Sequence, residues 1–487
     1  MSALPWLLAL PLAAAGITGA LVRLRREQAA AALGVVTSLV LLALALVLVA
    51  EVAPGPAARH RLLDAGGLAL DLRADGLAAL LVVVAAVVGV VGAAYAAGYR
   101  RAAPLPGAFW PWWLLLTAAM NGVFILGHLF ALYVAFELVG VAAAALVALG
   151  GGRALRSARR YLVVAVAGSL VFLVGAALLY AATGTLALAE LPGQAEPSLA
   201  AGVALGLMTL GLLATAALFP LHFWLPDAHA QAPAPASPLL SALVLKVYFY
   251  VVVVLWFQAL PQLVTAAAGV VLGVAGAAAI LWGGVAALTQ RSVKRLVVYS
   301  TLSQMGYLWL IPAILAGQAE PDPAGWFGWH GGIYYAITHS SAKAAMLMVA
   351  GALVHAAGAD RLVRLRGAAA RAPVAVFAFA LAGVNLVGLP PTGGFVGKWY
   401  LLSAAVAGGQ WWIAAVVLAG GGLTAAYLIR VLRLAFMRSE PAPDPAAPAL
   451  ALPALGLALV TVLLGFRAVE VLALLEVGAP AVAGGAT

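Results

Sequence analysis

Long apolar stretches separated by short polar segments run along nearly the whole chain. Most of the stretches hold about 20 residues, the length that a helix needs to cross the hydrocarbon core of a bilayer. The pattern therefore predicts an all-α polytopic membrane protein with fourteen transmembrane helices. The predicted ranges are 3–22, 30–51, 76–99, 109–126, 128–149, 158–183, 199–219, 236–257, 263–288, 293–316, 330–357, 372–389, 411–434 and 450–475.

Proline and glycine interrupt this pattern at two places. The segment "FPLHFWLPDAHAQAPAPASP" (219–238) follows the seventh predicted helix, and "GLPPTGGFVGKWYLL" (388–402) interrupts the twelfth. Proline removes a helix hydrogen bond and glycine permits sharp turns, so both helices should be broken. Pro220 and Pro390 are separated by 170 residues and five predicted helices.

An odd number of helices in a repeat inverts the second copy, so the matched breaks predict two inverted five-helix repeats with an ion site near the midplane. The alternative interpretation is that proline and glycine are simply frequent in membrane helices. The repeat interpretation divides the chain into N-terminal helices one to three, a first repeat, a second repeat and a last helix. Their expected boundaries are 1–104, 105–260, 261–440 and 441–487.

Composition supports a membrane protein and excludes several kinds of chemistry. Of the 487 residues, 65% are hydrophobic and 9% are charged, which is not the composition of a soluble globular domain. The chain has no cysteine, which excludes disulfides and thiolate-held iron–sulfur clusters and argues against zinc. We therefore expect no cofactor and no metal site, and any redox centre would belong to a partner.

The basic residues predict the topology. Nineteen of the 26 Lys and Arg residues lie in predicted loops that follow helices one, three, five, nine, eleven and thirteen, so nucleic acid is not an expected partner despite the net charge of +10. These loops are 23–26, 100–101, 153–160, 291–295, 361–371 and 430–438. The positive-inside rule places them in the cytoplasm and both termini outside the cell inner (plasma) membrane. No basic residue precedes the first apolar run, which predicts a retained helix rather than a cleaved signal peptide.

One carboxylate is expected deep in the membrane. Glu137 lies at the centre of the fifth predicted helix, and Tyr133 lies one turn earlier on the same face. A charge at that depth costs about 2.5–3.5 kcal/mol on insertion scales, so it usually faces a partner or water. The alternative is a carboxyl group that caps a neighbouring helix.

Lysine is rare in this chain and is concentrated in apolar segments. Lys246 is the only Asp, Glu, Lys or Arg between 228 and 290, and Tyr250 follows it by one turn. A buried lysine can release its proton, whereas arginine stays charged in any setting. Lys246 is therefore a candidate for a titrating site, and a permanent ion pair is the alternative.

Three more basic side chains fall in the apolar segments. His339 and Lys343 are four residues apart on one helix face and could pass a proton along the membrane plane. Lys398 follows the second break directly, where the alternative is that its side chain extends to a membrane surface. Lys294 lies beside two arginines, where a role in topology is sufficient.

Two histidines accompany the first break. His222 and His229 flank Asp227 at a spacing that could suggest a metal site. The prolines around them break the helix that such a site would need, so we expect these side chains to line water instead.

Four segments that carry these residues resemble one protein family. The segments are "FPLHFWLPDAHAQAPAPASPLLSALVLKVYFY", "KRLVVYSTLSQMGY", "ITHSSAKAAMLMVAG" and "GLPPTGGFVGKWYLL". In order and over roughly residues 105–440, they resemble the antiporter-like subunits. That family comprises the proton-pumping membrane subunits of respiratory complex I, the large subunits of Mrp-type cation/proton antiporters, and relatives in membrane-bound hydrogenases. The resemblance implies fourteen helices with two inverted repeats and broken helices seven and twelve.

The resemblance also implies roles for single residues. Glu137, Lys246, the pair His339 and Lys343, and Lys398 match the family's proton-translocating positions on helices five, eight, eleven and twelve. They would form a hydrophilic axis between half-channels that reach opposite surfaces. Tyr133, Thr215, His222, His229, Tyr250 and Gln304 would line the channel.

One position departs from the family pattern. Thr215 occupies the place where the family usually has a lysine paired with the glutamate of helix five. Glu137 would then be neutral, rely on Lys246, or face a lysine from an adjacent subunit. Some relatives also have histidine at the position of Gln304, which removes one relay group.

The resemblance leaves two functions open. The first is a subunit of a multi-subunit assembly, most like the D-type subunit of Mrp antiporters, which exchange protons for Na⁺ or another cation. The second is a proton-pumping membrane subunit of an NADH-quinone oxidoreductase or a membrane-bound hydrogenase, in which a partner carries out the electron transfer. A stand-alone ion carrier is a weaker third interpretation. The expected partners are other membrane subunits, the lipid bilayer and the transported ions.

Overall fold

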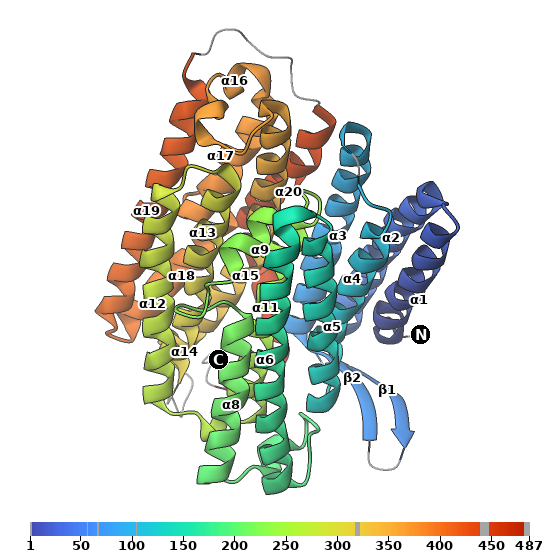
Figure 1. The fold of residues 1–487 in the computed structure, drawn as a ribbon. Helices are drawn as coiled ribbons and strands as arrows, with labels where there is room; N and C mark the ends of the chain where they lie inside the picture. The colour runs from blue at the N-terminus through green and yellow to red at the C-terminus, as the bar shows by residue number, and fades with distance from the viewer. Residues whose placement is uncertain are drawn as a thin grey trace.

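The structure, a computed structural model, describes residues 2–55, 57–65, 68–103, 105–316, 322–438 and 448–481. The described chain is almost entirely helical, and most of its helices stand side by side in one bundle (Figure 1). One antiparallel hairpin, of β1 (Ala58–Ala65) and β2 (Leu68–Ala74), projects from one end of the bundle (Figure 1).

The helices before the first break belong to the N-terminal part of the bundle. They are α1 (Leu4–Arg23), α2 (Glu27–Val52), α3 (Gly76–Ala102), α4 (Phe109–Ile125), α5 (Leu129–Ala148), α6 (Gly152–Thr183), the short α7 (Leu191–Gln194) and α8 (Leu199–Thr215).

The helices after this break include several short or irregular turns. They are α9 (Leu225–Gln231), α10 (Ser237–Leu239), the π-helical turn η1 (Leu240–Val244), α11 (Leu245–Val254), the π-helical turn η2 (Leu255–Ala259), the 3₁₀ turn η3 (Pro261–Leu263), α12 (Ala266–Thr289), α13 (Val293–Gly306), the 3₁₀ turn η4 (Leu308–Leu310), α14 (Ile311–Leu315), α15 (Pro323–Ala357), the 3₁₀ turn η5 (Leu362–Leu365), α16 (Ala368–Arg371), α17 (Pro373–Val387), α18 (Gly393–Ala407), α19 (Trp411–Phe436), α20 (Pro448–Phe466) and α21 (Ala468–Leu475).

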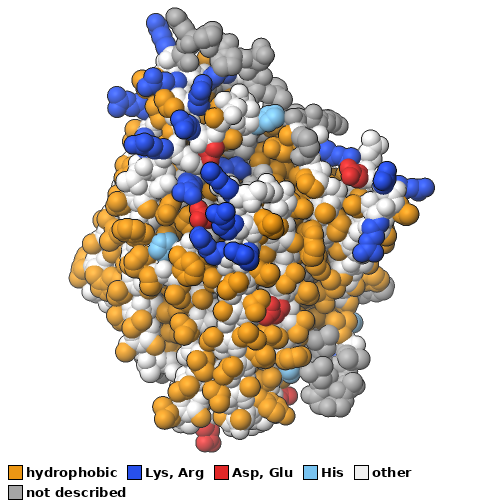
Figure 2. Space-filling model, viewed as in Figure 1, with side chains coloured by type: hydrophobic (Ala, Val, Ile, Leu, Met, Phe, Trp, Pro, Cys, Tyr) orange, Lys and Arg blue, Asp and Glu red, His pale blue; other side chains and the backbone are white. Residues whose placement is uncertain are grey.

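The described helices have the length and composition of membrane spans. Nine are long and apolar enough to cross a bilayer, counting the run Ser237–Ala259 as one, and a tenth results if α20 and α21, which meet at 77°, form one span. The shorter helices α4, α8 and α17 are also apolar. Hydrophobic side chains cover most of the face seen in Figure 2, and Lys and Arg gather toward one end. The chain is therefore a mostly helical, membrane-spanning protein.

The backbone leaves the helical conformation at both proline-rich segments. Helix α8 ends at Thr215 and α9 begins at Leu225, while α17 ends at Val387 and α18 begins at Gly393. The second interruption is shorter than the predicted 388–402 because most of that segment already belongs to α18. A third break separates α13 from α14, where Pro312 lacks the N–H that would continue the ladder.

Helix α15 lies inside the bundle and organises the site. It is 35 residues long and packs against α3, α13, α17, α18 and α20. Its side chains are buried almost without interruption from Gly328 to Leu353. The polar residues of α15 therefore face other helices rather than lipid.

Several basic segments that were predicted as loops are helical. Segment 153–160 lies in α6, which begins at Gly152, segment 100–101 lies in α3, and most of segment 430–438 lies in α19, which ends at Phe436. The hairpin of β1 and β2 was not predicted. The predicted repeat boundaries at 104 and 440 lie outside the described residues.

Candidate functional site

Four buried basic side chains come together at the centre of the bundle. Lys246 on α11, His339 and Lys343 on α15, and Lys398 on α18 have exposed fractions of 1%, 0%, 0% and 6%. The amines of all three lysines lie close enough to the His339 ring for their charges to repel a proton on it, and the charge of Lys246 also repels that of Lys343. Four of the five residues of the predicted axis therefore lie together, whereas Glu137 does not, and none of the four forms an ion pair with a carboxylate of the described residues.

Lys246 is held by a carbonyl of its own helix. Its Nζ donates to the Ala242 carbonyl at 2.5 Å, and the Ser340 hydroxyl of α15 donates to the same oxygen at 3.0 Å. Ala242 lies in the π-helical turn η1, and π turns occur often at functional sites. One carbonyl therefore joins the lysine of α11 to α15.

The next two bases differ in their hydrogen bonding. Lys343 Nζ donates to the Ser300 hydroxyl and, at 3.3 Å, to the Val297 carbonyl, both on α13. Neither ring nitrogen of His339 has a hydrogen-bond partner among the described residues. Buried polar atoms without partners are rare in proteins, so the two ring nitrogens of His339 stand out as available to a proton or a water.

Lys398 is held at the second helix break, rather than reaching a membrane surface. Its Nζ donates to the carbonyls of Leu386 at 2.6 Å and Val387 at 3.4 Å, at the end of α17. The last carbonyls of a helix lack intrahelical partners and carry the negative end of its dipole, which favours a cation. Gly388 has φ +89°, and a Cβ there would lie 2.7 Å from the lysine Cδ, so glycine serves both the turn and the close approach.

Two aromatic rings surround the Lys398 amine. Its Nζ lies 4.1 Å from the ring centroid of Tyr307 and 5.4 Å from that of Tyr335. The Tyr335 ring also stacks on His339, with 5.9 Å between centroids. Tyr335 therefore connects Lys398 with the His339 end of the cluster.

Gln304 lines this region and is completely hydrogen-bonded. Its Oε1 accepts from the Tyr335 hydroxyl, and its Nε2 donates to Thr424 at 2.8 Å and to Tyr427 at 3.2 Å. The amide therefore fixes the Tyr335 ring and anchors α13 to α19.

Glu137 lies apart from the four bases. Its carboxylate accepts from the Ser169 hydroxyl of α6 and from Tyr133 on its own helix. No ion pair joins it to Lys246 or to any other basic side chain of the described residues. Of the three situations expected for Glu137, reliance on Lys246 is not observed.

Thr215 occupies the neighbouring turn of α8 without contributing to Glu137. It is buried, and its hydroxyl donates to the carbonyls of Gly211 and Leu212 in its own helix. Its methyl group packs against Gly168, the residue before Ser169. Thr215 thus contacts the residue next to Ser169, and Ser169 in turn donates to the Glu137 carboxylate.

The two histidines of the first break lie in a separate environment. His229 is buried against Trp224, and His222 stacks on Phe219. Asp227 between them accepts from Arg295 at 2.5 Å and from Arg160 at 3.3 Å. The structure thus ties α9 to α6 and α13 there, and among the described residues no three His, Asp or Glu side chains are arranged to hold a metal ion.

A small apolar cavity extends from Lys246 along α11. Tyr250 lines it together with residues of α3 and α15, and the Tyr250 hydroxyl donates to the Phe124 carbonyl at 3.0 Å. Asp75 is buried, at 3% exposure, and its carboxylate accepts a hydrogen bond from the Gln258 side-chain amide at 2.9 Å. Its negative charge also interacts with the Tyr250 hydroxyl. The cavity has a volume of only about 10 Å³, too small for an ordered water, so it is a packing gap beside Lys246 and not an open path.

Sequence reasoning missed most of the hydroxyl groups of the site. Ser300 and Tyr335 are four residues before Gln304 and His339, so each shares a helix face with a residue that was recognised. Ser340 and Tyr307 are three residues from Lys343 and Gln304 and also share a helix face with them, but which lysine each one meets depends on the packing of separate helices.

Comparison with known proteins gives consistent similarities. Residues 127–424 match the family described as "NADH:quinone oxidoreductase/Mrp antiporter, TM". The N-type subunit of the NADH-quinone oxidoreductase of Desulforudis audaxviator is 34% identical over 77% of this chain and 74% of its own. The D-type subunit of the Na(+)/H(+) antiporter of Alkalihalophilus pseudofirmus is 31% identical over 82% of this chain and 80% of its own. A chain of the Mrp complex from Dietzia sp. superposes with a TM-score of 0.88 at 26% identity, over 99% of this chain and 97% of that one.

Proposed function

We propose that this chain, which belongs to the NADH:quinone oxidoreductase/Mrp antiporter transmembrane family, moves protons through the cluster of Lys246, His339, Lys343 and Lys398. The observation that carries the proposal is that four buried nitrogen bases lie in one region, connected through the Ala242 carbonyl and the Tyr335 ring, and that none of them forms an ion pair with a carboxylate of the described residues. Permanent charges in such a place would be expensive. Bases that exchange a proton avoid that cost.

The cluster would work by repulsion between neighbouring charges. When one base is protonated, its charge disfavours protonation of the next, so a proton that enters at one end displaces another. Lysine and histidine can do this, whereas arginine cannot release its proton. The Ser300 hydroxyl and the unpartnered His339 ring provide the transfer groups between the amines.

The proposed access routes use the remaining site residues. A path from Lys246 past Tyr250 toward Asp75 would lead to one membrane surface, and it would need the gap of about 10 Å³ there to widen and admit water. Tyr133, Thr215, His222, His229 and Gln304 would line polar paths in the two halves. Glu137 would act as a separate proton site, stabilised by Ser169 and Tyr133.

We also propose the finer architecture. The nine or ten spans, the three shorter apolar helices and the broken run α13–α14 support fourteen crossings of the inner (plasma) membrane. Two inverted units at 105–260 and 261–440 would each contain one helix broken at a proline-rich segment, and the second unit also contains the broken run α13–α14. The gathering of basic side chains at one end supports the cytoplasmic placement of that end and the outer placement of both termini (Figure 2).

The chain is an antiporter-like membrane subunit, and we propose that it works with other membrane subunits most like those of an Mrp cation/proton antiporter. The likeness to the Mrp complex over 99% of the chain, at a TM-score of 0.88, supports this assignment. The second candidate is a membrane subunit of a redox complex. It is favoured by the 34% identity to the N-type subunit of an NADH-quinone oxidoreductase and by a TM-score of 0.87 with a chain of an archaeal membrane-bound sulfane sulfur reductase.

The identity of the partners distinguishes these candidates. Mass spectrometry of the complex purified in mild detergent should find small membrane subunits alone for an antiporter. Flavin and iron–sulfur proteins would instead place the chain in a redox complex.

Replacement of Lys246 tests the proton-transfer proposal itself. Lys246→Arg keeps the charge but cannot release a proton, so ion-driven pH change in vesicles should fall nearly as far as in Lys246→Ala. Lys294→Arg is the matched control, because the Lys294 amine is bound to the Ala232 carbonyl outside the cluster. Full activity of the Lys246→Arg complex at normal assembly would exclude a titrating lysine at this position.

A further inference from the structure

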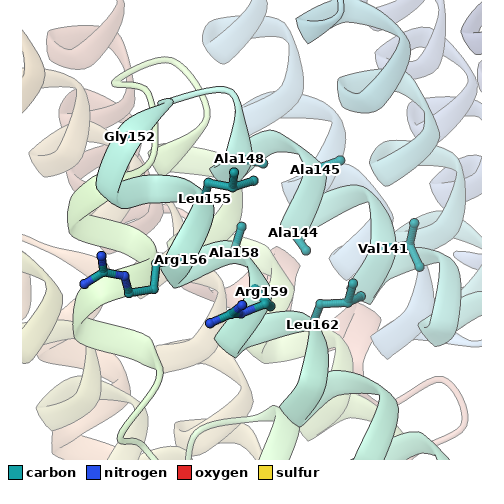
Figure 3. Close-up of a pocket in the computed structure, with 10 residues that line it drawn as sticks. All are labelled: Val141, Ala144, Ala145, Ala148, Gly152, Leu155, Arg156, Ala158, Arg159 and Leu162. Atoms are coloured by element: carbon teal, nitrogen blue, oxygen red, sulfur yellow. The ribbon is translucent and has the colours of Figure 1, made fainter.

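A groove runs between α5 and α6 at the end of the bundle where basic side chains gather. Small side chains of α5, among them Ala144, Ala145 and Ala148, form one wall (Figure 3). Leu155 and Leu162 of α6 line the other wall. The groove has a volume of about 700 Å³, within the range of roughly 300–1,000 Å³ typical of ligand sites.

Two arginines stand beside this apolar groove. Arg156 and Arg159 lie one turn apart on α6, both are exposed, and neither forms an ion pair or a side-chain hydrogen bond within the described part of the chain (Figure 3). Arg160, the next residue, instead binds Asp227 at 3.3 Å. The two guanidinium groups are therefore available to an outside anion.

The start of α6 adds to the positive potential. The helix begins at Gly152, which lines the groove, and Gly151 before it provides no side-chain cap. Backbone N–H groups at an uncapped helix N-terminus favour negative charge. Guanidinium groups can also hold phosphate oxygens with two parallel hydrogen bonds.

We propose that this groove binds an anionic phospholipid, with its phosphate at Arg156 and Arg159 and an acyl chain along the alanine wall of α5. The charge at one end and the apolar wall behind it match the two parts of such a lipid. Basic pockets between membrane helices bind anionic headgroups in this way. A second protein chain would leave two arginines to be neutralised, and free phosphate would leave the apolar wall uncovered.

Lipid retention tests the proposal. The complex is placed in nanodiscs of phosphatidylcholine with a minor fraction of phosphatidylglycerol, and retained lipids are counted by native mass spectrometry. Retention of phosphatidylglycerol should fall about 30-fold in Arg156→Gln/Arg159→Gln, because two favourable charges are lost. Arg23→Gln/Arg153→Gln, which removes two exposed arginines outside the groove, should retain the lipid like the unaltered complex.

A second measurement identifies the occupant without removing the arginines. A photoreactive residue at Ala145 should form its adduct with phosphatidylglycerol when the intact complex is illuminated in its membrane. A peptide adduct from a neighbouring subunit would overturn the proposal and make the groove a protein interface. Equal phosphatidylglycerol retention in the two double variants, or equal retention of phosphatidylcholine and phosphatidylglycerol, would also overturn it.

Discussion

The aromatic ring of Tyr307 should stabilise the charged form of Lys398, and its removal should change the pH dependence of transport. The amine lies 4.1 Å from the Tyr307 ring centroid, and both side chains are buried. Tyr307→Phe keeps the ring, whereas Tyr307→Leu removes it. The pair of variants therefore isolates the effect of the ring on the amine.

The size of the effect follows from the geometry. A cation over an aromatic ring away from water gains about 2 kcal/mol, so the Leu variant should lower the ratio of ammonium to free amine about 30-fold. About 2 kcal/mol corresponds to roughly 1.5 pH units. Tyr335, at 5.4 Å, keeps part of the interaction, so a downward shift of about one pH unit in half-maximal transport is expected.

The assay is ion-driven pH change in vesicles that contain the assembled complex, measured across a series of external pH values. Loss of the buried ring also costs packing energy, so rates are normalised to folded complex and the pH of half-maximal transport is the readout. Tyr307→Phe should keep the profile of the unaltered protein. Identical pH profiles for the Leu and Phe variants would refute a role of the ring in the charge of Lys398.

Three further predictions concern other parts of the chain. Thr215→Lys should shift the pH optimum of transport because it brings a cation near Glu137, and the shift should disappear in the double variant with Glu137→Gln. A cysteine placed at position 156, in a chain that has no other, should react with a membrane-impermeant maleimide only in inside-out vesicles. His128 accepts the Phe130 N–H at 3.3 Å as the cap of α5, and burial lowers the pKa of His128, with two nearby carboxylates acting against it. A protonated His128 ring nitrogen cannot accept the Phe130 N–H, so the thermal stability of the protein should fall as the pH drops from 7 to 5. In His128→Asn the side chain keeps a cap acceptor but cannot titrate, so this variant should lose less thermal stability over the same pH range.

The parts of the fold that could be predicted depend on local chemistry. The breaks near Pro220 and Pro390 follow from missing N–H groups and flexible glycines, which act within a few residues. The start of α6 was misjudged because positive charge marks a position relative to the membrane and does not end a helix. Arg153 and its neighbours continue the helix past the apolar stretch.

The candidate site shows the same limit at the level of side chains. Lys246, His339 and Lys343 stand out in the sequence because ionisable residues are costly in apolar helices. The carbonyl at Ala242 and the hydroxyl of Ser300 that bind these lysines carry no such signal. The Ala242 contact is local to the π-helical turn before α11, whereas the Ser300 contact depends on the packing of α13 against α15, which are distant in the chain.

The carbonyl groups at the two helix breaks are bound by donors of different chemistry. At the end of α8, the Ala214 carbonyl accepts from the Trp224 indole at 3.0 Å, a donor that cannot titrate. At the end of α17, the Leu386 carbonyl accepts from the Lys398 amine at 2.6 Å, which can titrate. A helix C-terminus favours a cation over a neutral amine, so proton release from Lys398 weakens the contact that joins α17 to α18. Of these two carbonyl contacts, the one at Lys398 can therefore respond to the arrival and departure of a proton, whereas the one at Trp224 cannot.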